Sequence, residues 1–386
     1  MVSVLNPPSV PNQRPIILTT FLAHALAAAS IFTRIPDLQK DLALSEAVLG
    51  LALTALPVAG LIANIAAGRV IEAVGTRAIV TLGIPLMAVF SATASLAPNL
   101  PLLLASFIGL GIAFSLANVA MNVEADRIET ATGRRVMNRC HGIWGAGMLA
   151  SSLIGAAARG TGVSAEVHLG AMIVPIALMS LMVLTRLEGK PVKGADTIRR
   201  AGLSLPTRAT MVVMLFGIAA GMSQAGAQNW SVIYLRDTFS APDWVDSLTI
   251  PAFLATMTLG RLFADTWIER FGAVRVALTQ TGLATLGALA VIAAPSAWFA
   301  VAGFAVMGAG SGVHFPLAIS AAAKLGDRPA AENVSAVILS MSAAMLAAPA
   351  IMGAIAEGYG LRMAFAAILP TLLISLALTP RVLARL

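Results

Sequence analysis

The fold of this chain is decided by Gly68-Arg69-Val70-Ile71-Glu72-Ala73-Val74-Gly75-Thr76-Arg77 and by a second copy, Asp265-Thr266-Trp267-Ile268-Glu269-Arg270-Phe271-Gly272-Ala273-Val274-Arg275. We call these the two repeat loops. Glu72 corresponds to Glu269 and Gly75 to Gly272, 197 residues further along a chain of 386 residues. This interval is close to half the chain, and each copy stands between long apolar runs. A loop repeated in this way predicts two copies of one membrane-embedded unit.

The composition places most of the surface in lipid. Hydrophobic residues make up 58% of the chain and charged residues only 11%, whereas a soluble domain carries roughly 25% charged residues. We therefore expect an all-α integral membrane protein, because helices of about 20 apolar residues cross a hydrocarbon core of roughly 30 Å. The net charge of +7 comes from loops between these runs. The expected partner is therefore the lipid bilayer and not nucleic acid.

The apolar runs predict twelve transmembrane helices in two six-helix, pseudo-symmetric bundles. The first six are expected at 15–35, 46–67, 78–97, 100–124, 139–158 and 165–185. The second six are expected at 208–235, 244–264, 274–294, 297–322, 332–355 and 362–381. The domains would then be a tail at 1–14, an N-terminal bundle at 15–186, a linker at 187–207 and a C-terminal bundle at 208–383.

The basic residues predict the orientation. If both termini lie inside, 20 of the 25 Lys and Arg residues fall in inside segments. Because inside loops collect positive charge, we expect cytoplasmic N and C termini and cytoplasmic repeat loops in a multi-pass protein of the bacterial inner (plasma) membrane. The five outside residues are Arg34, Lys40, Arg159, Arg236 and Arg362.

The charges near the membrane surfaces predict two gates. Acids and arginines in the repeat loops can pair between helices and hold the cytoplasmic side closed, and glycine permits the tight turn. At the other surface Arg34 and Asp37 are three residues apart, which makes them a candidate outer gate. The alternative is that these charges only anchor loops in water. The candidate cytoplasmic gate comprises Gly68, Glu72, Gly75, Arg77, His141, Asp265, Glu269, Arg270, Gly272 and Arg275.

Two six-span halves with such a loop after spans 2 and 8 resemble the major facilitator superfamily. The loop is similar to that family's Gly-x-x-x-Asp-Arg-x-Gly-Arg signature. The first copy matches it at Gly68, Glu72, Gly75 and Arg77, with Glu in place of Asp and Ala73 in place of Arg. The second copy matches at Glu269, Arg270 and Gly272, and has Asp265 at the glycine position. The resemblance implies transport by alternating access.

A narrower resemblance is to the YbjJ-type, fucose-permease-related bacterial transporters. It rests on Thr33-Arg34-Ile35-Pro36, Asn118-Val119-Ala120-Met121-Asn122, His141-Gly142-Ile143-Trp144, Asn229-Trp230, Phe315-Pro316-Leu317 and Tyr359-Gly360-Leu361-Arg362. This branch implies proton coupling through carboxylates. Here amides stand at those places, as Asn118, Gln224 and Asn229. An amide can hydrogen-bond a solute but cannot titrate, so coupling, if present, would need His24 or His314.

Polar residues inside the predicted spans are the candidate substrate site, because such residues need a partner, a wet cavity or a function. Asn118 and Asn122 share a helix face, and Gln224 and Gln228 form a second polar stripe. The run Gly310-Ser311-Gly312 with Pro316 should break its helix beside His314 and free backbone carbonyls. The same amides also suit hydrogen bonds that hold helices together. The candidate set is His24, Asn118, Asn122, Gln224, Gln228, Asn229, Trp230 and His314.

These observations predict a secondary transporter for a small polar solute, sugar-like or nucleoside-like. Whether protons are a second, co-transported partner stays an open question at this point. The histidines lack metal-ligand spacing and no phosphate-binding loop is visible, so neither a cofactor, a metal nor ATP is expected, and we do not expect an enzyme. We expect a monomer. Two alternatives remain open: an efflux antiporter for amphipathic compounds or drugs, and a membrane sensor that binds a ligand without moving it.

Overall fold

A computed structural model describes residues 13–133, 135–187 and 206–384, and throughout these residues the regular structure is helical. Ten helices in this part of the chain are long and apolar enough to cross a membrane. In the first half of the chain the helices are α1 (Arg14–Ala29), η1 (Phe32–Arg34), α2 (Ile35–Asp41), α3 (Glu46–Ser95), α4 (Leu100–Thr132), α5 (Met137–Gly160) and α6 (Ala165–Arg186). The second half forms α8 (Arg208–Phe239), α9 (Asp243–Asp246), α10 (Thr249–Phe271), α11 (Ala273–Ile292), α12 (Ala297–Ala309), α13 (His314–Ala323), α14 (Ala330–Tyr359), α15 (Leu361–Ala366) and α16 (Leu369–Leu383).

The long helix α3 reverses direction at Gly75. Gly60 packs against Gly111 of α4, and Gly83 packs against Ala117 of the same helix. A straight helix would separate residues 60 and 83 by about 34 Å, at 1.5 Å per residue, yet both contact one short stretch of α4. Gly75 makes the turn with φ 80° and ψ 156°, a conformation that a side chain would strain. The helix is therefore a hairpin of two segments.

Gly272 repeats this turn in the second half of the chain. It joins α10 to α11 with φ 84° and ψ 149°, close to the dihedral angles of Gly75. The two glycines that correspond in the sequence repeat thus adopt the same left-handed conformation, which favours glycine at both places. Two further interruptions divide the apolar helices. The run at 310–313 separates α12 from α13, as its glycines and Pro316 predict, and η1 interrupts the first apolar stretch.

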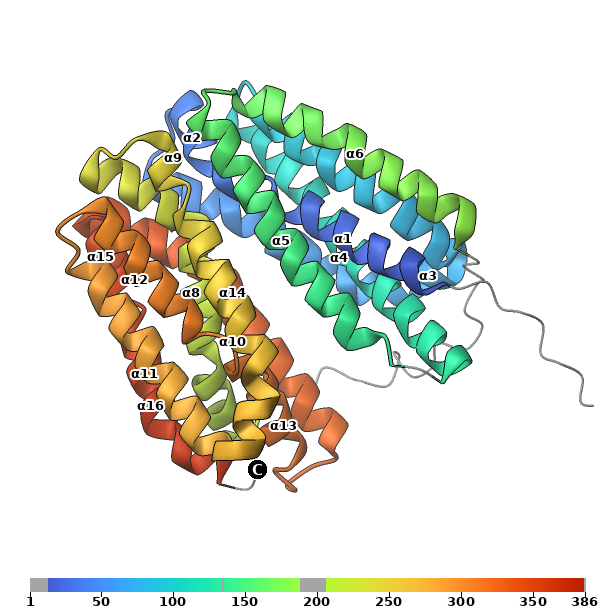
Figure 1. Cartoon of the computed structure of the whole chain (residues 1–386), viewed down its shortest axis with the longest axis vertical. Helices are drawn as coiled ribbons and strands as arrows, with labels where there is room; N and C mark the ends of the chain where they lie inside the picture. Colours follow the sequence, from blue (N-terminus) through green and yellow to red (C-terminus); the bar gives the residue numbers. More distant parts are fainter. Residues whose placement is uncertain (1–12, 134, 188–205, 385–386) are drawn as a thin grey trace, which may run out of the picture.

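The helices form two groups, α1–α6 and α8–α16, which we call the N-half and the C-half. They meet where α2 and α9 lie and diverge toward the opposite end, where the C-terminus lies (Figure 1). We call these two ends the α2/α9 end and the repeat end, because the repeat end carries Gly75 and Gly272. The predicted linker at 187–207 and the predicted tail at 1–14 lie mostly outside the described residues.

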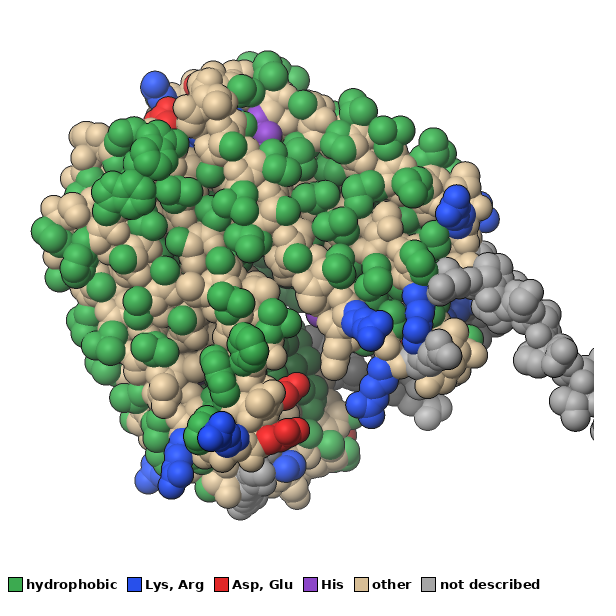
Figure 2. Space-filling view, in the orientation of Figure 1, with side chains coloured by type: hydrophobic (Ala, Val, Ile, Leu, Met, Phe, Trp, Pro, Cys, Tyr) green, Lys and Arg blue, Asp and Glu red, His purple; other side chains and the backbone are tan. Residues whose placement is uncertain are grey.

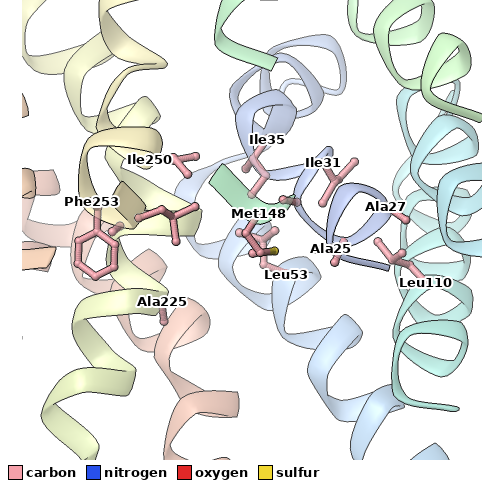
Figure 3. Packing of buried hydrophobic residues seen from close by; sticks show 14 of the residues in the cluster. Ala25, Ala27, Ile31, Ile35, Leu53, Leu110, Met148, Ala225, Ile250 and Phe253 are labelled. Atoms are coloured by element: carbon pink, nitrogen blue, oxygen red, sulfur yellow. The ribbon is translucent and has the colours of Figure 1, made fainter. Parts of the chain in front are cut away.

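The buried core matches this shape. One hydrophobic cluster contains residues of both halves, such as Leu53 and Met148 with Ile250 and Phe253. Figure 3 shows these side chains facing one another where the halves meet. A second cluster lies within the C-half alone and includes Phe216, Val276, Leu317 and Leu383. The core is therefore continuous between the halves only toward the α2/α9 end. Toward the repeat end, a hollow separates the halves in the space-filling view (Figure 2).

Candidate functional site

Glycines let the helix backbones of the two halves touch. A Cβ atom on Gly50 of α3 would lie 2.5 Å from the carbonyl oxygen of Pro349 on α14, and one on Gly353 would lie 2.4 Å from that of Glu46. At Gly160 of α5, a Cβ atom would lie 2.6 Å from the Cβ atom of Trp244. Any larger residue at these positions would push the halves apart. The helices of the two halves are therefore in direct backbone contact at the α2/α9 end.

An arginine network also joins the halves at the α2/α9 end. Arg159 of α5 contacts Asp37 of its own half with 3.4 Å between Nε and Oδ1. The same guanidinium donates to Ser247 Oγ at 3.2 Å and lies 3.5 Å from Asp243. Asp246 is fully buried, and its Oδ2 lies 3.9 Å from Arg159 NH1. The guanidinium of one residue thus links acids of both halves.

The candidate outer gate pair lies in this network. Arg34 donates from NH1 to Asp37 Oδ2 at 3.1 Å, from Nε to His168 Nδ1 at 3.1 Å and from NH2 to the Val163 carbonyl at 3.0 Å. On the other side of the junction, Arg236 of α8 donates to the Pro36 carbonyl at 2.9 Å. It also donates to Gln39 Oε1 at 2.8 Å.

Sequence reasoning named Arg34 and Asp37 but missed Arg159 and Arg236. A signal was present, because only five basic residues were assigned outside, and these two are among them. When a membrane surface carries only a few cations, each of them is worth testing as a gate residue if its helix ends opposite acidic residues. A further contact, from the Ala47 amide to Glu357 Oε2 at 2.8 Å, joins α3 to α14.

At the repeat end the residues of the candidate cytoplasmic gate lie apart. Glu72, Asp265, Glu269, Arg270 and Arg275 are exposed, and His141 is exposed with its ring against Phe21. Among the described residues none of these charges forms an ion pair across the halves. Arg77 donates from NH2 to the Leu184 carbonyl within the N-half, and Gly68 is half-buried. Any pairing of the two repeat loops would therefore need the halves to approach at this end.

The first repeat loop is tied to its own half. Thr76, next to Gly75, donates from Oγ1 to Glu124 Oε2 at 2.8 Å, and Arg127 pairs with the same oxygen at 3.0 Å. Glu124 is buried at the repeat-end portion of α4, so its charge is compensated by both groups. The first loop can then move only together with α4.

The two candidate histidines lie inside their own halves. His24 is fully buried, and its Nδ1 accepts from Trp144 Nε1 at 3.1 Å. Its Nε2 must then carry the proton and donate to the Phe114 carbonyl at 3.2 Å. His314 is also fully buried, and its Nε2 lies 2.8 Å from Thr281 Oγ1. Thr281 Oγ1 also lies 2.7 Å from the Ala277 carbonyl, so a proton on His314 Nε2 would let this hydroxyl accept from the ring and donate to that carbonyl. The Nδ1 atom of His314 has no partner.

The candidate amides are divided between two places. Asn122 donates from Nδ2 to the backbone carbonyl of Asn118 at 2.8 Å, and the same nitrogen lies 3.4 Å from Asn118 Oδ1, so these two half-buried side chains contact each other on α4. Gln228 and Asn229 of α8 instead line a cavity of about 150 Å³ between the halves. The remaining lining residues are apolar: Ile31, Phe32, Ile35, Leu53, Leu56, Pro57, Phe107, Ala225, Met345 and Pro349.

Within this cavity Gln228 carries the free donor. Its Nε2 is buried without a hydrogen-bond partner, whereas Asn229 donates from Nδ2 to the Ala225 carbonyl at 2.9 Å. Trp230 is fully buried against Gly353, and Gln224 is half-buried. An unpaired buried donor is costly unless a ligand or water satisfies it, so Gln228 is positioned to bind a polar group of a ligand.

A larger cavity of about 570 Å³ lies between α10 and α11. Its lining residues Leu259, Trp267 and Phe271 are exposed apolar side chains. On α10, Thr256, Gly260 and Trp267 of this lining lie on the face opposite Thr258, because successive residues turn by 100°. Since Thr258 packs toward Gly145 of the N-half, this cavity faces away from the hollow between the halves, toward lipid.

Sequence comparisons identify the family. Residues 16–255 match the family model described as Major Facilitator Superfamily. The uncharacterized transporter y4wD of Sinorhizobium fredii is 28% identical over 353 residues, which cover 89% of this chain and 91% of the relative. The membrane protein MosC of Rhizobium meliloti is 26% identical over 349 residues, covering 88% and 83%.

Solved structures agree with this family in fold. The nucleoside transporter NupG superimposes with a TM-score of 0.72 at 13% identity, covering 97% of this chain and 98% of NupG. A D-xylose-proton symporter superimposes with a TM-score of 0.70 at 11% identity, covering 96% of each chain. At these identities the likeness concerns the fold alone. Since the family match covers more than half of the residues, this chain belongs to the Major Facilitator Superfamily and is a multi-pass membrane transporter of that type.

Proposed function

We propose that this protein is a secondary active transporter that moves a small polar solute, sugar-like or nucleoside-like, by rocker-switch alternating access. The observation that carries the proposal is the asymmetry between its two ends. A continuous apolar core and Arg159 join the halves at the α2/α9 end, whereas the repeat loops make no ion pair across the halves among the described residues. Such a conformation is one of the two states that alternating access requires.

The proposed topology has twelve spans in two six-helix halves, at 15–186 and 208–383, joined by a linker at 187–207. Ten apolar helices support it, because α3 is a hairpin that supplies two crossings and α5 adds another 24-residue helix. The 20-to-5 distribution of basic residues supports cytoplasmic termini in a bacterial inner membrane. The repeat end would then face the cytoplasm, so the conformation described is inward-facing. We propose a monomer as the working unit.

The cavity between the halves is the proposed centre of the substrate site. Gln228 supplies a buried, unpaired donor there, and Asn229 lines the same space. Amide side chains suit solutes rich in hydroxyl groups or carrying a nucleobase, because an amide both donates and accepts hydrogen bonds. We place the protein in the YbjJ-type, fucose-permease-related branch on the motifs quoted above.

We propose that protons drive the transport and that His314, not His24, is the group that takes them up. Both ring nitrogens of His24 are hydrogen-bonded, so protonation would break the bond from Trp144. The Nδ1 atom of His314 has no partner and can accept a proton without losing a contact. Since His314 follows the broken segment at 310–313, a movement of that segment would let water reach the ring.

A second candidate function is efflux of amphipathic compounds. It is favoured by the lining of the central cavity, where every residue except Gln228 and Asn229 is apolar. Overexpression that confers resistance to amphipathic toxins, together with no uptake of sugars or nucleosides into vesicles, would support this candidate over solute uptake.

The test is uptake into proteoliposomes with an imposed pH gradient, after a thermal-shift screen of sugars and nucleosides. A ligand that binds only the folded protein raises its Tm.

Spin labels on Asp41→Cys and Tyr359→Cys report on the α2/α9 end, and labels on Ala73→Cys and Arg270→Cys report on the repeat end. We expect a bound solute to change the two distances in opposite directions. Two distances that stay fixed under every ligand would point to a sensor and contradict the proposal.

A further inference from the structure

Arg261 is a cation in the repeat-end half of a helix that is long and apolar enough to cross a membrane. It is the thirteenth residue of α10, which runs over 23 residues from Thr249 to Phe271. Insertion scales give a cost of up to roughly 2.5–3.5 kcal/mol for a guanidinium at the centre of such a helix, so a cation within it needs a partner, a wet cavity or a function. The expected span at 244–264 already contained this charge. It lies four residues before Asp265, where the second repeat loop begins.

The side chain faces the space between the halves. Thr258 of α10 lies against Gly145 of α5, where a Cβ atom on the glycine would be 3.6 Å from Thr258 Oγ1. Arg261 follows three residues later and therefore lies on the same face of α10, one turn closer to the repeat end. Arg261 is exposed, and its charge acts on the imidazole of His141 in the N-half. Arg261 therefore lies on the side of α10 that faces α5 of the N-half.

Arg261 has almost no partners within the described part of the chain. Its side chain makes one long hydrogen bond there, from Nε to the Gly312 carbonyl at 3.4 Å. No carboxylate among the described residues lies within ion-pairing distance, although Asp265 is one turn away on the same helix. A guanidinium has five N–H donors, so the terminal nitrogens remain available to a ligand.

The broken segment between α12 and α13 holds this arginine in place. The carbonyl of Gly312 is free because the helix is interrupted there, and it accepts the Nε–H of Arg261. A Cβ atom on Gly312 would lie 3.3 Å from Arg261 Cγ, so glycine permits the close approach. With Nε fixed in this way, the two terminal nitrogens form a fork of the kind that binds carboxylate or phosphate with two parallel hydrogen bonds.

We propose that Arg261 binds an anionic group, a carboxylate or a phosphate monoester, on the solute that enters between the halves. This inference rests on the proposed transport function and narrows its solute to sugar-like or nucleoside-like anions. Arg261 would bind the charged part of such a solute. The anion compensates the guanidinium, which an uncharged solute cannot do.

Matched solute pairs test this assignment. Thermal shifts and equilibrium binding are measured with glucose against glucuronate and with adenosine against adenosine monophosphate, each up to about 10 mM. We expect only the anionic member of a pair to stabilise the protein. Arg261→Gln should weaken its binding about 10- to 100-fold. Arg261→Lys should lie in between, because it keeps the charge and loses the fork.

Arg208→Gln is the matched control, because Arg208 is exposed at the start of α8 and should bind the anion as the unaltered protein does. Gly312→Ala is a second variant with Arg261 intact. It should weaken anion binding by displacing the arginine, so the proposal stays testable if Arg261→Gln folds poorly. Equal stabilisation by both members of a pair, no stabilisation by either anion, or unchanged binding in Arg261→Gln would each overturn the anion site.

The outcomes also separate this inference from the proposed function. Uptake of neutral solutes, with anions excluded, would overturn the anion site and leave the transporter proposal standing. Binding of an anion that depends on Arg261, with no uptake into proteoliposomes, would overturn the transporter proposal and support the anion site.

Discussion

Arg159 of α5 and Asp246 of α9 face each other across the junction of the two halves, with 3.9 Å between NH1 and Oδ2. Their side chains are 4% and 0% exposed. Neither carboxylate oxygen of Asp246 has a hydrogen-bond partner, and Arg159 is the cation within ion-pairing distance of it. Removing one partner of a buried pair is far more costly than removing an exposed pair.

Arg159→Gln should therefore open the α2/α9 end. The substitution leaves Asp246 buried without its ion-pair partner and also removes the contacts of Arg159 with Asp37 and Asp243. Because a buried acid without a partner takes up a proton, we expect the closed end to be destabilised by about 1–3 kcal/mol. Labels at positions 41 and 359 should move apart and labels at 73 and 270 should approach, as measured by electron paramagnetic resonance. Lys40→Gln is the control, because Lys40 is exposed on α2 at the same end. If Arg159→Gln gives the distance distributions of Lys40→Gln, Arg159 does not hold this end closed.

Gly75→Ala and Gly272→Ala should lower the thermal stability by similar amounts. Both glycines have φ near +80° with an extended ψ, a region where a side chain costs about 1–3 kcal/mol. Gly170→Ala and Gly282→Ala are controls in α6 and α11, where an added Cβ atom meets nothing within 4 Å. In these helix interiors alanine should be neutral or stabilising by up to about 1 kcal/mol. A Tm for Gly75→Ala equal to that of Gly170→Ala would contradict the strained turn.

The helices could be predicted from the sequence because the membrane fixes their length and composition. The expected run at 165–185 became α6, Ala165–Arg186, and the run at 208–235 became α8, Arg208–Phe239. The ends were less predictable. The run expected at 100–124 continues as helix to Thr132 and stops at Gly133, which is left-handed. Apolarity ends where lipid ends, whereas a helix ends where its backbone is capped.

The site was only partly predictable, because its contacts depend on how the bundles pack. Arg34 and Asp37 are three residues apart, and their predicted contact is observed at 3.1 Å. The bond from Trp144 to His24 joins residues 120 positions apart, and no local pattern indicates it. The junction of Arg159 with Asp246 likewise requires both halves. Local spacing therefore predicted a pair within one half, and the contacts between elements came only from the structure.

Gly50→Ala should weaken the closed end without removing any charge. Its Cβ atom would lie 2.5 Å from the Pro349 carbonyl, 3.2 Å from Ala350 Cα and 3.2 Å from Gly353 Cα. Backbone atoms cannot turn aside as a flexible side chain can, so α3 and α14 must separate. We expect a longer 41–359 distance and slower uptake. Gly358→Ala, on α14 with open space around its Cβ position, should leave both unchanged. Equal behaviour of the two variants would show that the backbone contact is not needed.

The two buried histidines should respond differently to substitution. His24→Gln removes a ring whose nitrogens bind Trp144 and the Phe114 carbonyl, so we expect a loss of stability of about 1–3 kcal/mol while uptake still follows the pH gradient. His314→Gln removes the ring with a free Nδ1 atom, so uptake should no longer depend on the gradient, although solute binding remains. The measurement is uptake into proteoliposomes with and without an imposed gradient, alongside Tm. Trp144→Phe is the control for His24, because it frees Nδ1 and keeps the ring. If gradient-driven uptake fails in His24→Gln and persists in His314→Gln, His24 is the proton-accepting residue and the assignment drawn from their hydrogen bonds is wrong.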